Sequence, residues 1–264
     1  MKYLVFGDVH ANLVALDAVL AAGDRHRVDA YLFVGDLVGY GPEPLECLER
    51  LAPLYRDERM AWVAGNHDVV ARGDCEPGGF GPEAMATLEW TIEVVRGQQW
   101  AMTFLASGHP VAKVDGGIWL THDSLAAPGS GYYHRATQNA SRELASLTAH
   151  GGRIAFYGHT HTMRGEVQAG GAVMLTPMTA CEHGGKDGDP LRLGPDERAW
   201  LGTGSVGFPT KKKGAAEFLI LNHADWTIEK YTVPFSREDA KRRVRAVFGP
   251  VCEAGIVDKL VKWL

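Results

Sequence analysis

The 264-residue sequence lacks the features that mark secreted, disulfide-stabilised and membrane-spanning proteins. Its four cysteines, Cys47, Cys75, Cys181 and Cys252, are scattered and form no Cys-x-x-Cys pair, so neither a zinc knuckle nor a redox pair is indicated. No apolar run approaches the ~18 residues of a membrane span. The opening apolar run, residues 3–6, is far shorter than the core of a signal peptide. We therefore expect a cytoplasmic protein.

Positive charge is also scarce. Asp and Glu number 32 against 27 Lys and Arg, which gives a formal net charge of −5. This balance argues against a surface that binds extended nucleic acid or an anionic membrane non-specifically. Residues 211–213, three lysines, form a compact basic run. They are interpreted either as a solvated loop or as a group that steers phosphate toward a site.

The hydrophobic pattern predicts an α/β fold. Apolar runs of about four residues that end in glycine or a polar turn indicate buried strands. Such runs span residues 3–6, 31–34, 60–64 and 154–157, and hairpins are predicted over 111–120, 166–175 and 218–233. Helical spacing fills several of the segments between them, beginning with a helix capped by Asn12.

The chain shows no internal repeat and no linker between two self-sufficient halves, so we predict one domain over residues 1–264. Two parts of this domain stand out. The segment of about 176–195 is dense in Gly, Pro and charge and is predicted to be an inserted loop, a feature that is often functional in a compact domain. Residues 236–264 are predicted to form a C-terminal helical segment, which begins with a capping box at Ser236.

Five times, a short apolar strand ends in a turn that carries potential metal ligands. The residues on these turns are Asp8 and His10, then Asp36, then Asn66 and His67, then His122, and finally His159 and His161. Ligands of open α/β sheets bind at the carboxyl ends of the strands, so we expect the five turns to converge on one crevice. Two histidines on a turn that leaves a strand can diverge, and can then serve two different ions.

The types of ligand indicate which metals would bind. Oxygen and imidazole nitrogen without thiolate suit first-row ions such as manganese, iron, cobalt or zinc. Seven ligands are too many for one tetrahedral ion, but two ions that share a carboxylate account for them, at the ~3.5–4 Å separation typical of paired sites. Only Asp8 and Asp36 carry negative charge, so the site stays net positive and favours a phosphate ester.

These motifs, from residue 8 to residue 161, resemble those of the calcineurin-like metallophosphoesterases in type and in order. The run Gly204-Ser205-Val206-Gly207 resembles a further signature of their small bacterial phosphodiesterase branch. The resemblance implies a four-layer αββα sandwich with two mixed β-sheets. It also implies one metal ion held by Asp8, His10, Asp36 and His161, and a second held by Asp36, Asn66, His122 and His159, with Asp36 bridging. His67 would be the catalytic imidazole that stabilises the phosphoryl group or protonates the leaving alkoxide.

The function implied is that of a dinuclear metal-dependent phosphoesterase. It would hydrolyse a phosphodiester or phosphomonoester bond of a small substrate by in-line attack of a metal-bridging hydroxide. The cofactors would be two divalent or trivalent transition-metal ions, manganese first, with iron, cobalt, nickel or zinc as alternatives. A dinucleoside-polyphosphate hydrolase and a non-catalytic interaction scaffold on the same fold are the other hypotheses. Scaffolds of that kind have an eroded ligand set, whereas all seven ligands are present here. Neither the substrate-binding residues nor the oligomeric state is indicated, and the substrate could be a nucleotide.

The chain also departs at several positions from the family that it resembles. Many members of that family carry a second aspartate three residues after the bridging one, where it orients the catalytic histidine, but this chain has Gly39. The protein-phosphatase branch has arginines where Tyr40 and residues 69–71 stand here. Serine/threonine protein phosphatase activity is therefore not expected, and the sequence does not indicate what orients His67.

Overall fold

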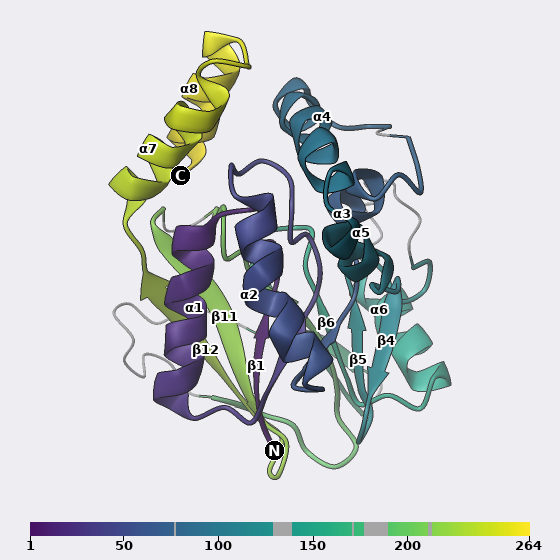
Figure 1. Ribbon diagram of the computed structural model, residues 1–264. Helices are drawn as coiled ribbons and strands as arrows, with labels where there is room; N and C mark the ends of the chain where they lie inside the picture. Colours follow the sequence, from purple (N-terminus) through teal and green to yellow (C-terminus); the bar gives the residue numbers. More distant parts are fainter. Residues whose placement is uncertain (77, 129–138, 171, 177–189, 211–212) are drawn as a thin grey trace.

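The computed structural model describes residues 1–76, 78–128, 139–170, 172–176, 190–210 and 213–264 (Figure 1). The strands of the first sheet are β1 (Lys2–Phe6), β2 (Ala30–Phe33), β3 (Met60–Trp62), β9 (Leu191–Arg192), β11 (Ala215–Asn222) and β12 (Thr227–Pro234). Those of the second sheet are β4 (Val111–Val114), β5 (Ile118–Thr121), β6 (Ile154–Tyr157), β7 (Met163–Ala169), β8 (Ala172–Thr176) and β10 (Arg198–Thr203). The helices are α1 (Leu13–His26), α2 (Pro44–Arg56), α3 (Asn66–Ala71), α4 (Pro82–Arg96), α5 (Gln99–Ala106), α6 (Ala140–Ala149), α7 (Arg237–Phe248) and α8 (Ala254–Trp263).

Both sheets are mixed. The first has the order β3-β2-β1-β11-β12-β9, in which β1, β2 and β3 are parallel and β11, β12 and β9 pair antiparallel. The second has the order β4-β5-β6-β10-β7-β8, with β5, β6 and β10 parallel. In each sheet the parallel strands lie next to one another, so their carboxyl ends share one edge.

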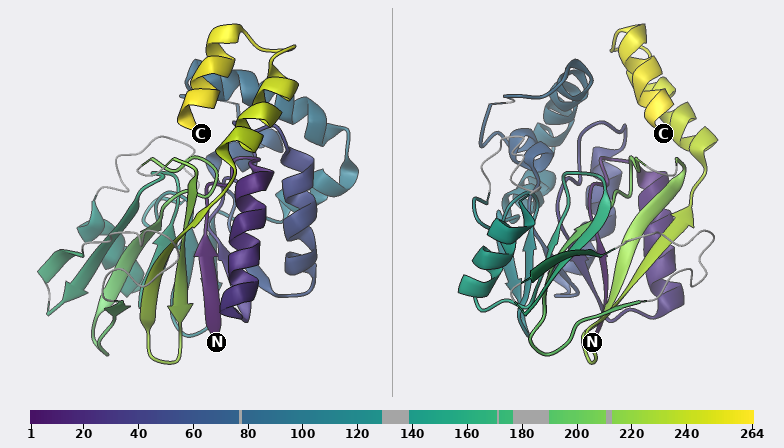
Figure 2. Two further views of the ribbon diagram at one scale, coloured as in Figure 1. Left: turned by 90° about the vertical axis from the view of Figure 1, so that its left-hand side faces the viewer. Right: turned by 180° about the vertical axis from the view of Figure 1, so that it is seen from behind.

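Three apolar clusters separate the layers. Residues of alternating strand positions, such as Val5 and Phe156, fill the space between the two sheets. The opposite face of the first sheet packs on α1, α2 and α5, for example through Phe6 against Leu16. The outer face of the second sheet packs on α6, where Trp200 is buried. The layers therefore run helix, sheet, sheet, helix, and the predicted four-layer αββα sandwich is confirmed (Figures 1 and 2).

The structure departs from the sequence expectations in three places. Strand β10 was not predicted, although it lies at the centre of the second sheet. The turn after β3 leads at once into the short helix α3. Most of the predicted inserted loop lies outside the described residues, and its end contains β9, which pairs with β12.

The C-terminal helical segment forms two helices, α7 and α8, which are amphipathic and pack together through Val244, Phe248, Val257 and Leu260. They stand above the sheets at the same end as α4 and opposite the N-terminus (Figures 1 and 2). Within the described part of the chain, none of the helices combines the length and the hydropathy that crossing a bilayer requires.

Candidate metal centre

The turns that follow the parallel strands bring the predicted site residues to one place. Asp8 follows β1, Asp36 follows β2 and Asn66 opens α3 directly after β3, whereas His122 follows β5 and His159 follows β6. The first three come from one sheet and the last two from the other, so the site lies where the two sheets meet at their common end. All seven predicted ligands and His67 lie in this cluster.

One group of ligand atoms forms around Asp8 and His10. The Nε2 atom of His10 lies 3.9 Å from Asp8 Oδ1 and 3.7 Å from Asp36 Oδ2. The Nε2 atom of His161 lies 2.9 Å from that of His10 and 3.4 Å from Asp8 Oδ1. Atoms that bind one transition-metal ion at about 2.1 Å are roughly 3–3.5 Å apart. These four side chains therefore have the spacing of a ligand set.

A second group forms around Asn66. Its Oδ1 atom lies 3.1 Å from His122 Nε2 and 2.9 Å from His159 Nδ1. His122 Nε2 in turn lies 3.1 Å from Asp36 Oδ2. The same oxygen of Asp36 thus approaches histidines of both groups, which is the position that a bridging carboxylate needs. His159 and His161 diverge as expected, one to each group.

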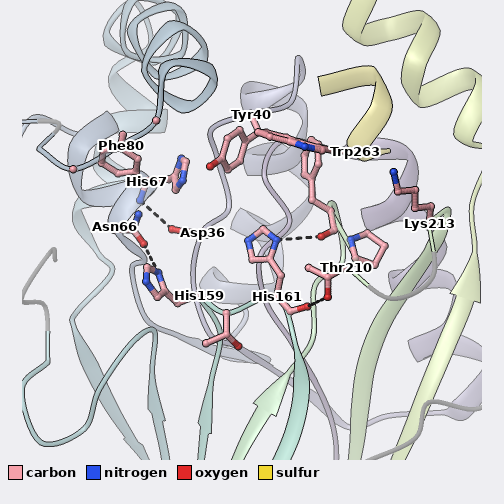
Figure 3. Close-up of a pocket in the computed structure, with 15 residues that line it drawn as sticks. Asp36, Tyr40, Asn66, His67, Phe80, His159, His161, Thr210, Lys213 and Trp263 are labelled. Carbon is pink, nitrogen blue, oxygen red and sulfur yellow. Dashed lines mark hydrogen bonds between the residues drawn. The ribbon is translucent and has the colours of Figure 1, made fainter. Parts of the chain in front are cut away.

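His67 lies beside both groups, and its distances alone do not define its role. A ligand atom of His67 is within 4.8 Å of ligand atoms of His10 and Asp36. Its backbone N–H donates to Asp36 Oδ1 at 3.0 Å, which ties the start of α3 to the shared carboxylate. Its ring forms part of the cavity wall, where substrate could contact it (Figure 3).

Backbone carbonyls orient three of the imidazoles. The Nδ1 atoms of His10, His122 and His161 lie 3.3, 2.8 and 3.1 Å from the carbonyl oxygens of Val38, Val34 and Phe208. In this arrangement Nδ1 carries the proton and donates it to the carbonyl, which leaves the lone pair of Nε2 directed into the cluster. Histidines that bind metals in proteins almost always have such a partner on the second nitrogen.

The backbone of the ligand turns is held in an unusual conformation. Asp8, His10, Asp36, His159 and His161 have φ between +48° and +62°, the left-handed region that non-glycine residues seldom occupy. Each such residue costs roughly 1–2 kcal/mol. Strained residues of this kind gather at functional sites and persist only where the surroundings fix them. Five of the seven predicted ligands have this left-handed backbone, so contacts elsewhere in the fold must offset its cost in free energy.

Asp68 is the residue that fixes two of these turns, and the sequence reasoning did not assign it a role. Its buried carboxylate accepts hydrogen bonds from the backbone N–H groups of Asp36, Leu37 and Val38 at 2.8, 2.9 and 3.2 Å. It accepts another from Gly65 at 2.9 Å. The only signal in the sequence was its place in the run Gly65-Asn66-His67-Asp68.

The turn of residues 204–207 supports the centre from behind. The Ser205 hydroxyl donates to the Asp8 carbonyl at 3.0 Å and accepts from the Phe208 N–H at 3.0 Å. The Gly207 N–H donates to the same Asp8 carbonyl at 2.9 Å. The Phe208 carbonyl in turn accepts a hydrogen bond from His161. The turn therefore positions Asp8 and, through Phe208, His161, which both belong to the first group of ligand atoms. Its resemblance to a family signature thus has a physical reason.

Charges within the cluster shift the pKa values of its members. Burial raises the pKa of Asp8 to about 6. Burial would also raise the pKa of Asp36, but the imidazoles beside it, His122 first, hold it well below its usual range. Burial alone would lower the pKa of His122, yet the Asp36 carboxylate raises it to about 10. His10, by contrast, has a pKa well below its usual range because it is fully buried. The neutral imidazole of His10 is therefore a ready ligand for a cation, whereas His122 must lose a proton before it can bind one.

The donor set fits two first-row transition-metal ions. It consists of carboxylate, amide and imidazole atoms and contains no thiolate, which suits such ions. Asp8 Oδ2 is buried and has no hydrogen-bond partner among the described residues, as expected of an atom that a cation would satisfy. Gly65 makes the approach of the turns feasible, because a Cβ atom there would lie 2.1 Å from Asp36 Oδ1.

Beside the centre lies a cavity of about 450 Å³. Asp36, Asn66, His67, His159 and His161 form its floor (Figure 3). Its other walls include four aromatic rings and one lysine, which come from segments far apart in the sequence: Tyr40, Phe80, Phe208, Lys213 and Trp263. Of these lining residues the sequence had singled out only Lys213 for a role toward phosphate, as part of the run 211–213.

Comparisons with known proteins show which family and which fold the chain has. A family model described as calcineurin-like phosphoesterase matches residues 1–163. An uncharacterised protein of Methanocaldococcus jannaschii is 26% identical over 243 residues, which cover 91% of this chain and 90% of that protein. A crystal structure of a metallophosphoesterase from Sphaerobacter thermophilus is similar with a TM-score of 0.76 at 27% identity, and covers 100% of this chain and 99% of that one. A hypothetical protein of Pyrococcus horikoshii has the same fold, with a TM-score of 0.73 at 15% identity over 98% of this chain and 97% of that one. The family model covers more than half of the sequence, and the chain therefore belongs to the calcineurin-like phosphoesterase family.

Proposed function

We propose that the protein is a dinuclear metal-dependent phosphoesterase that hydrolyses a phosphodiester or phosphomonoester bond of a small substrate. One observation carries the proposal. Three imidazoles are fixed through Nδ1 by backbone carbonyls, so that their Nε2 atoms point at two groups of ligand atoms that share Asp36 Oδ2. Such second-partner hydrogen bonds are typical of histidines that bind metals, and here three of them occur around one shared carboxylate oxygen.

The first ion would be held by Asp8, His10, Asp36 and His161, and the second by Asp36, Asn66, His122 and His159. Manganese is our first choice, with iron, cobalt, nickel or zinc as alternatives. When bound, such ions supply Lewis-acid activation of water and of the phosphoryl oxygens. Asp8 and Asp36 contribute two negative charges against four or more positive ones, so the floor of the cavity attracts an anionic ester.

His67 is the residue that we assign to proton handling. Its ring lines the cavity and packs at 4.9 Å from Phe80 and 4.7 Å from Tyr40, measured between ring centroids. An imidazole held there can donate a hydrogen bond to a phosphoryl oxygen or a proton to the leaving alkoxide. The aromatic neighbours restrict the tilt of the ring in place of the aspartate that many relatives use.

The pairing of the strands supports a single domain over residues 1–264. β11, from the last quarter of the chain, pairs with β1 along four residues, and β10 lies between β6 and β7 in the second sheet. Neither half of the sequence could form its sheet alone. We also retain the cytoplasmic location as a prediction.

The experiment that tests the function separates metal binding from catalysis. The protein is freed of metal with a chelator, reloaded with manganese, and assayed on bis(p-nitrophenyl) phosphate, with the bound metal counted by mass spectrometry. We expect activity only after reloading and about two ions per chain. His67→Ala should keep both ions and lose about 10²–10⁴-fold in kcat. His150→Ala, an exposed histidine at the end of α6, is the matched control and should behave as wild type.

Three results would contradict parts of the proposal. Hydrolysis that is unaffected by chelation would remove the metal from the reaction. Loss of an ion in His67→Ala would make His67 a ligand, and full activity in that variant would exclude it from catalysis. Profiling cyclic nucleotides, dinucleoside polyphosphates and phosphopeptides with the reloaded enzyme would then distinguish the phosphoesterase from the dinucleoside-polyphosphate hydrolase.

A further inference from the structure

The cavity beside the metal centre is larger than a phosphoryl group needs. Its volume of about 450 Å³ falls in the range of pockets that enclose small organic ligands, roughly 300–1,000 Å³. The ligand residues occupy only its floor. The remaining walls should therefore contact the organic group of the substrate, and their chemistry indicates what that group is.

One wall is aromatic. The Tyr40 and Phe208 rings lie 5.5 Å apart between centroids, and the Trp263 ring meets Tyr40 edge-on at 5.7 Å and 88°. Tyr40 and Phe208 also pack against His10, at 4.9 and 5.9 Å, so the wall begins at the metal centre. Figure 3 shows Tyr40 and Trp263 together on one side of the cavity, above His67 and His161. A flat ring that extends from the phosphoryl group would lie along this wall.

Trp263 is exposed although the helix that carries it is firmly packed. Helix α8 buries Val257 and Leu260 against α7, and Lys259 pairs with Glu83 of α4. Trp263 itself keeps 38% of its surface exposed, and it lines the cavity. With Tyr40 and Phe208 it forms a contiguous aromatic surface in a cavity, and such apolar surfaces are typical of ligand-binding grooves. The helix thus places an indole over the site at little further cost in entropy.

The same wall carries a positive charge. Lys213 is the one lysine or arginine among the described residues that line the cavity, and its Nζ donates to the carbonyl of Lys262 in the last turn of α8. An ammonium group has three donors, so two stay available for a ligand. Lys213 belongs to the basic run 211–213, for which a phosphate-steering role was one interpretation; Lys211 and Lys212 lie outside the described residues.

A second, smaller cavity of about 210 Å³ shares Asn66, Phe80 and His159 with the first and contains no lysine or arginine among its described lining residues. Three carboxylates, Asp74, Glu76 and Asp123, line it together with His122 and His159. An anionic group would be repelled there. The electrostatics therefore favour the aromatic, lysine-bearing side for a substrate group that carries negative charge.

We propose that Trp263, Tyr40 and Phe208 form a subsite for a planar aromatic ring, and that Lys213 binds a second anionic group attached to it. The substrate would then be a phosphate ester whose organic group is aromatic and carries negative charge beyond the scissile phosphate. This inference rests on the proposed phosphoesterase function, since it assumes that the phosphoryl group lies on the metal centre. Phe208, Lys213 and Trp263 fall outside residues 1–163 that match the family model, so family membership does not supply them.

The subsite for the aromatic ring is tested with phosphonates. Their carbon–phosphorus bond is not an ester, so these compounds measure binding rather than turnover. Affinities of benzylphosphonate and methylphosphonate for the manganese-loaded protein are measured by calorimetry. We expect wild type to prefer the benzyl compound by about 5- to 150-fold, as for a base stacked on an aromatic side chain. Trp263→Ala should lose most of this preference and Trp263→Phe should keep part of it. Trp100→Ala, on α5, removes an equally exposed tryptophan (39% against 38%) that does not line the cavity, and should leave the preference unchanged.

The role of the Lys213 charge is tested by comparing the affinities of 4-carboxybenzylphosphonate and benzylphosphonate. Lys213 is exposed, so we expect the added carboxylate to improve binding by only about 2- to 5-fold at low salt. Lys213→Met should abolish this gain, whereas Lys113→Met, a change of the same charge on β4, should not.

The outcomes distinguish this inference from the function on which it rests. If the protein hydrolyses bis(p-nitrophenyl) phosphate but binds benzylphosphonate no more tightly than methylphosphonate, the subsite alone is overturned. The same conclusion follows if Trp263→Ala keeps the full preference for benzylphosphonate. Absence of hydrolysis together with absence of phosphonate binding would overturn both. Circular dichroism shows whether Trp263→Ala has lost helical structure. If it has, Trp263→Leu replaces it as the variant without a ring, because leucine retains an apolar contact with Tyr40.

Discussion

The glycine that replaces the expected aspartate near His67 provides the sharpest test of the site. Gly39 has φ of +87°, and a Cβ atom there would lie 2.2 Å from His67 Nδ1 and 2.9 Å from its Cγ. Nonbonded carbon contacts are usually about 3.5 Å, so the ring would have to move by about 1 Å. Restoring the aspartate of the relatives by Gly39→Asp should therefore displace His67 rather than orient it.

The size of the effect follows from this displacement. Misplacing a catalytic group by ~1 Å can cost about 10²-fold in rate, so we expect kcat to fall by about that factor in Gly39→Ala and Gly39→Asp. The left-handed backbone adds roughly 1–2 kcal/mol of strain, which should appear as a lower free energy of unfolding in urea. Both ions should stay bound, because the three atoms nearest to the added Cβ all belong to His67, which is not one of the predicted ligands.

Two comparisons isolate the clash from the strain. Gly151→Ala has the same type of backbone (φ +66°) with nothing within 4 Å of the new Cβ, and should lose stability without losing activity. The double variant Gly39→Ala/His67→Ala should be no less active than His67→Ala alone, because the ring that is displaced is then absent. Equal or higher kcat in Gly39→Asp would refute the reasoning and would mean that the ring and turn rearrange to accept the carboxylate.

Three further predictions concern stability and metal binding. Glu143→Ala should lower the free energy of unfolding by about 3 kcal/mol or more in a urea titration, since its buried carboxylate accepts three hydrogen bonds from the loop after β5 that would be left unpaired; a loss below 1 kcal/mol would contradict this. Trp200→Ala should cost about 3–5 kcal/mol in the same measurement, because the ring is buried and stacked on Tyr157 at 4.5 Å. Manganese binding should release protons and weaken as the pH falls, since the pKa of His122 is raised to about 10 in the ion-free protein. Calorimetry in buffers of different ionisation enthalpy measures that release, and a binding enthalpy independent of the buffer would exclude it.

The sequence predicted the ends of the strands better than the strands themselves. Short apolar runs before Asp8, Asp36 and His159 were sufficient to locate the parallel strands, because buried central strands are apolar on both faces. Because ligands of open α/β sheets bind at the carboxyl ends of the strands, the turns that follow these strands could then be predicted to meet. The distances between the ligand atoms could not be predicted, because they depend on how the two sheets pack.

The features that the sequence missed have tertiary causes. β10 is a short strand, Arg198–Thr203, bounded by polar residues, and it exists because it pairs with β6 on one side and β7 on the other. α3 has six residues, too few for a periodic pattern, and isolated helices of this length are unstable. Its N-terminal residues are held instead by Asp68 and Asp36. The aromatic wall of the cavity likewise depends on where α8 packs.

The two parts of the chain contribute differently to the proposed function. Residues up to His161 supply all the predicted ligands and His67, and five of these ligands have a left-handed backbone. The later residues hold those turns through Ser205, and they supply the cavity wall through Phe208, Lys213 and Trp263. Apart from Tyr40, which belongs to the proposed ring subsite, the residues for hydrolysis and those for substrate choice would then lie in different segments of one fold. Related chains that keep the first set and change the second should carry out the same hydrolysis on different organic groups, so substrate assignments in this family should be compared at the cavity wall rather than at the ligand motifs.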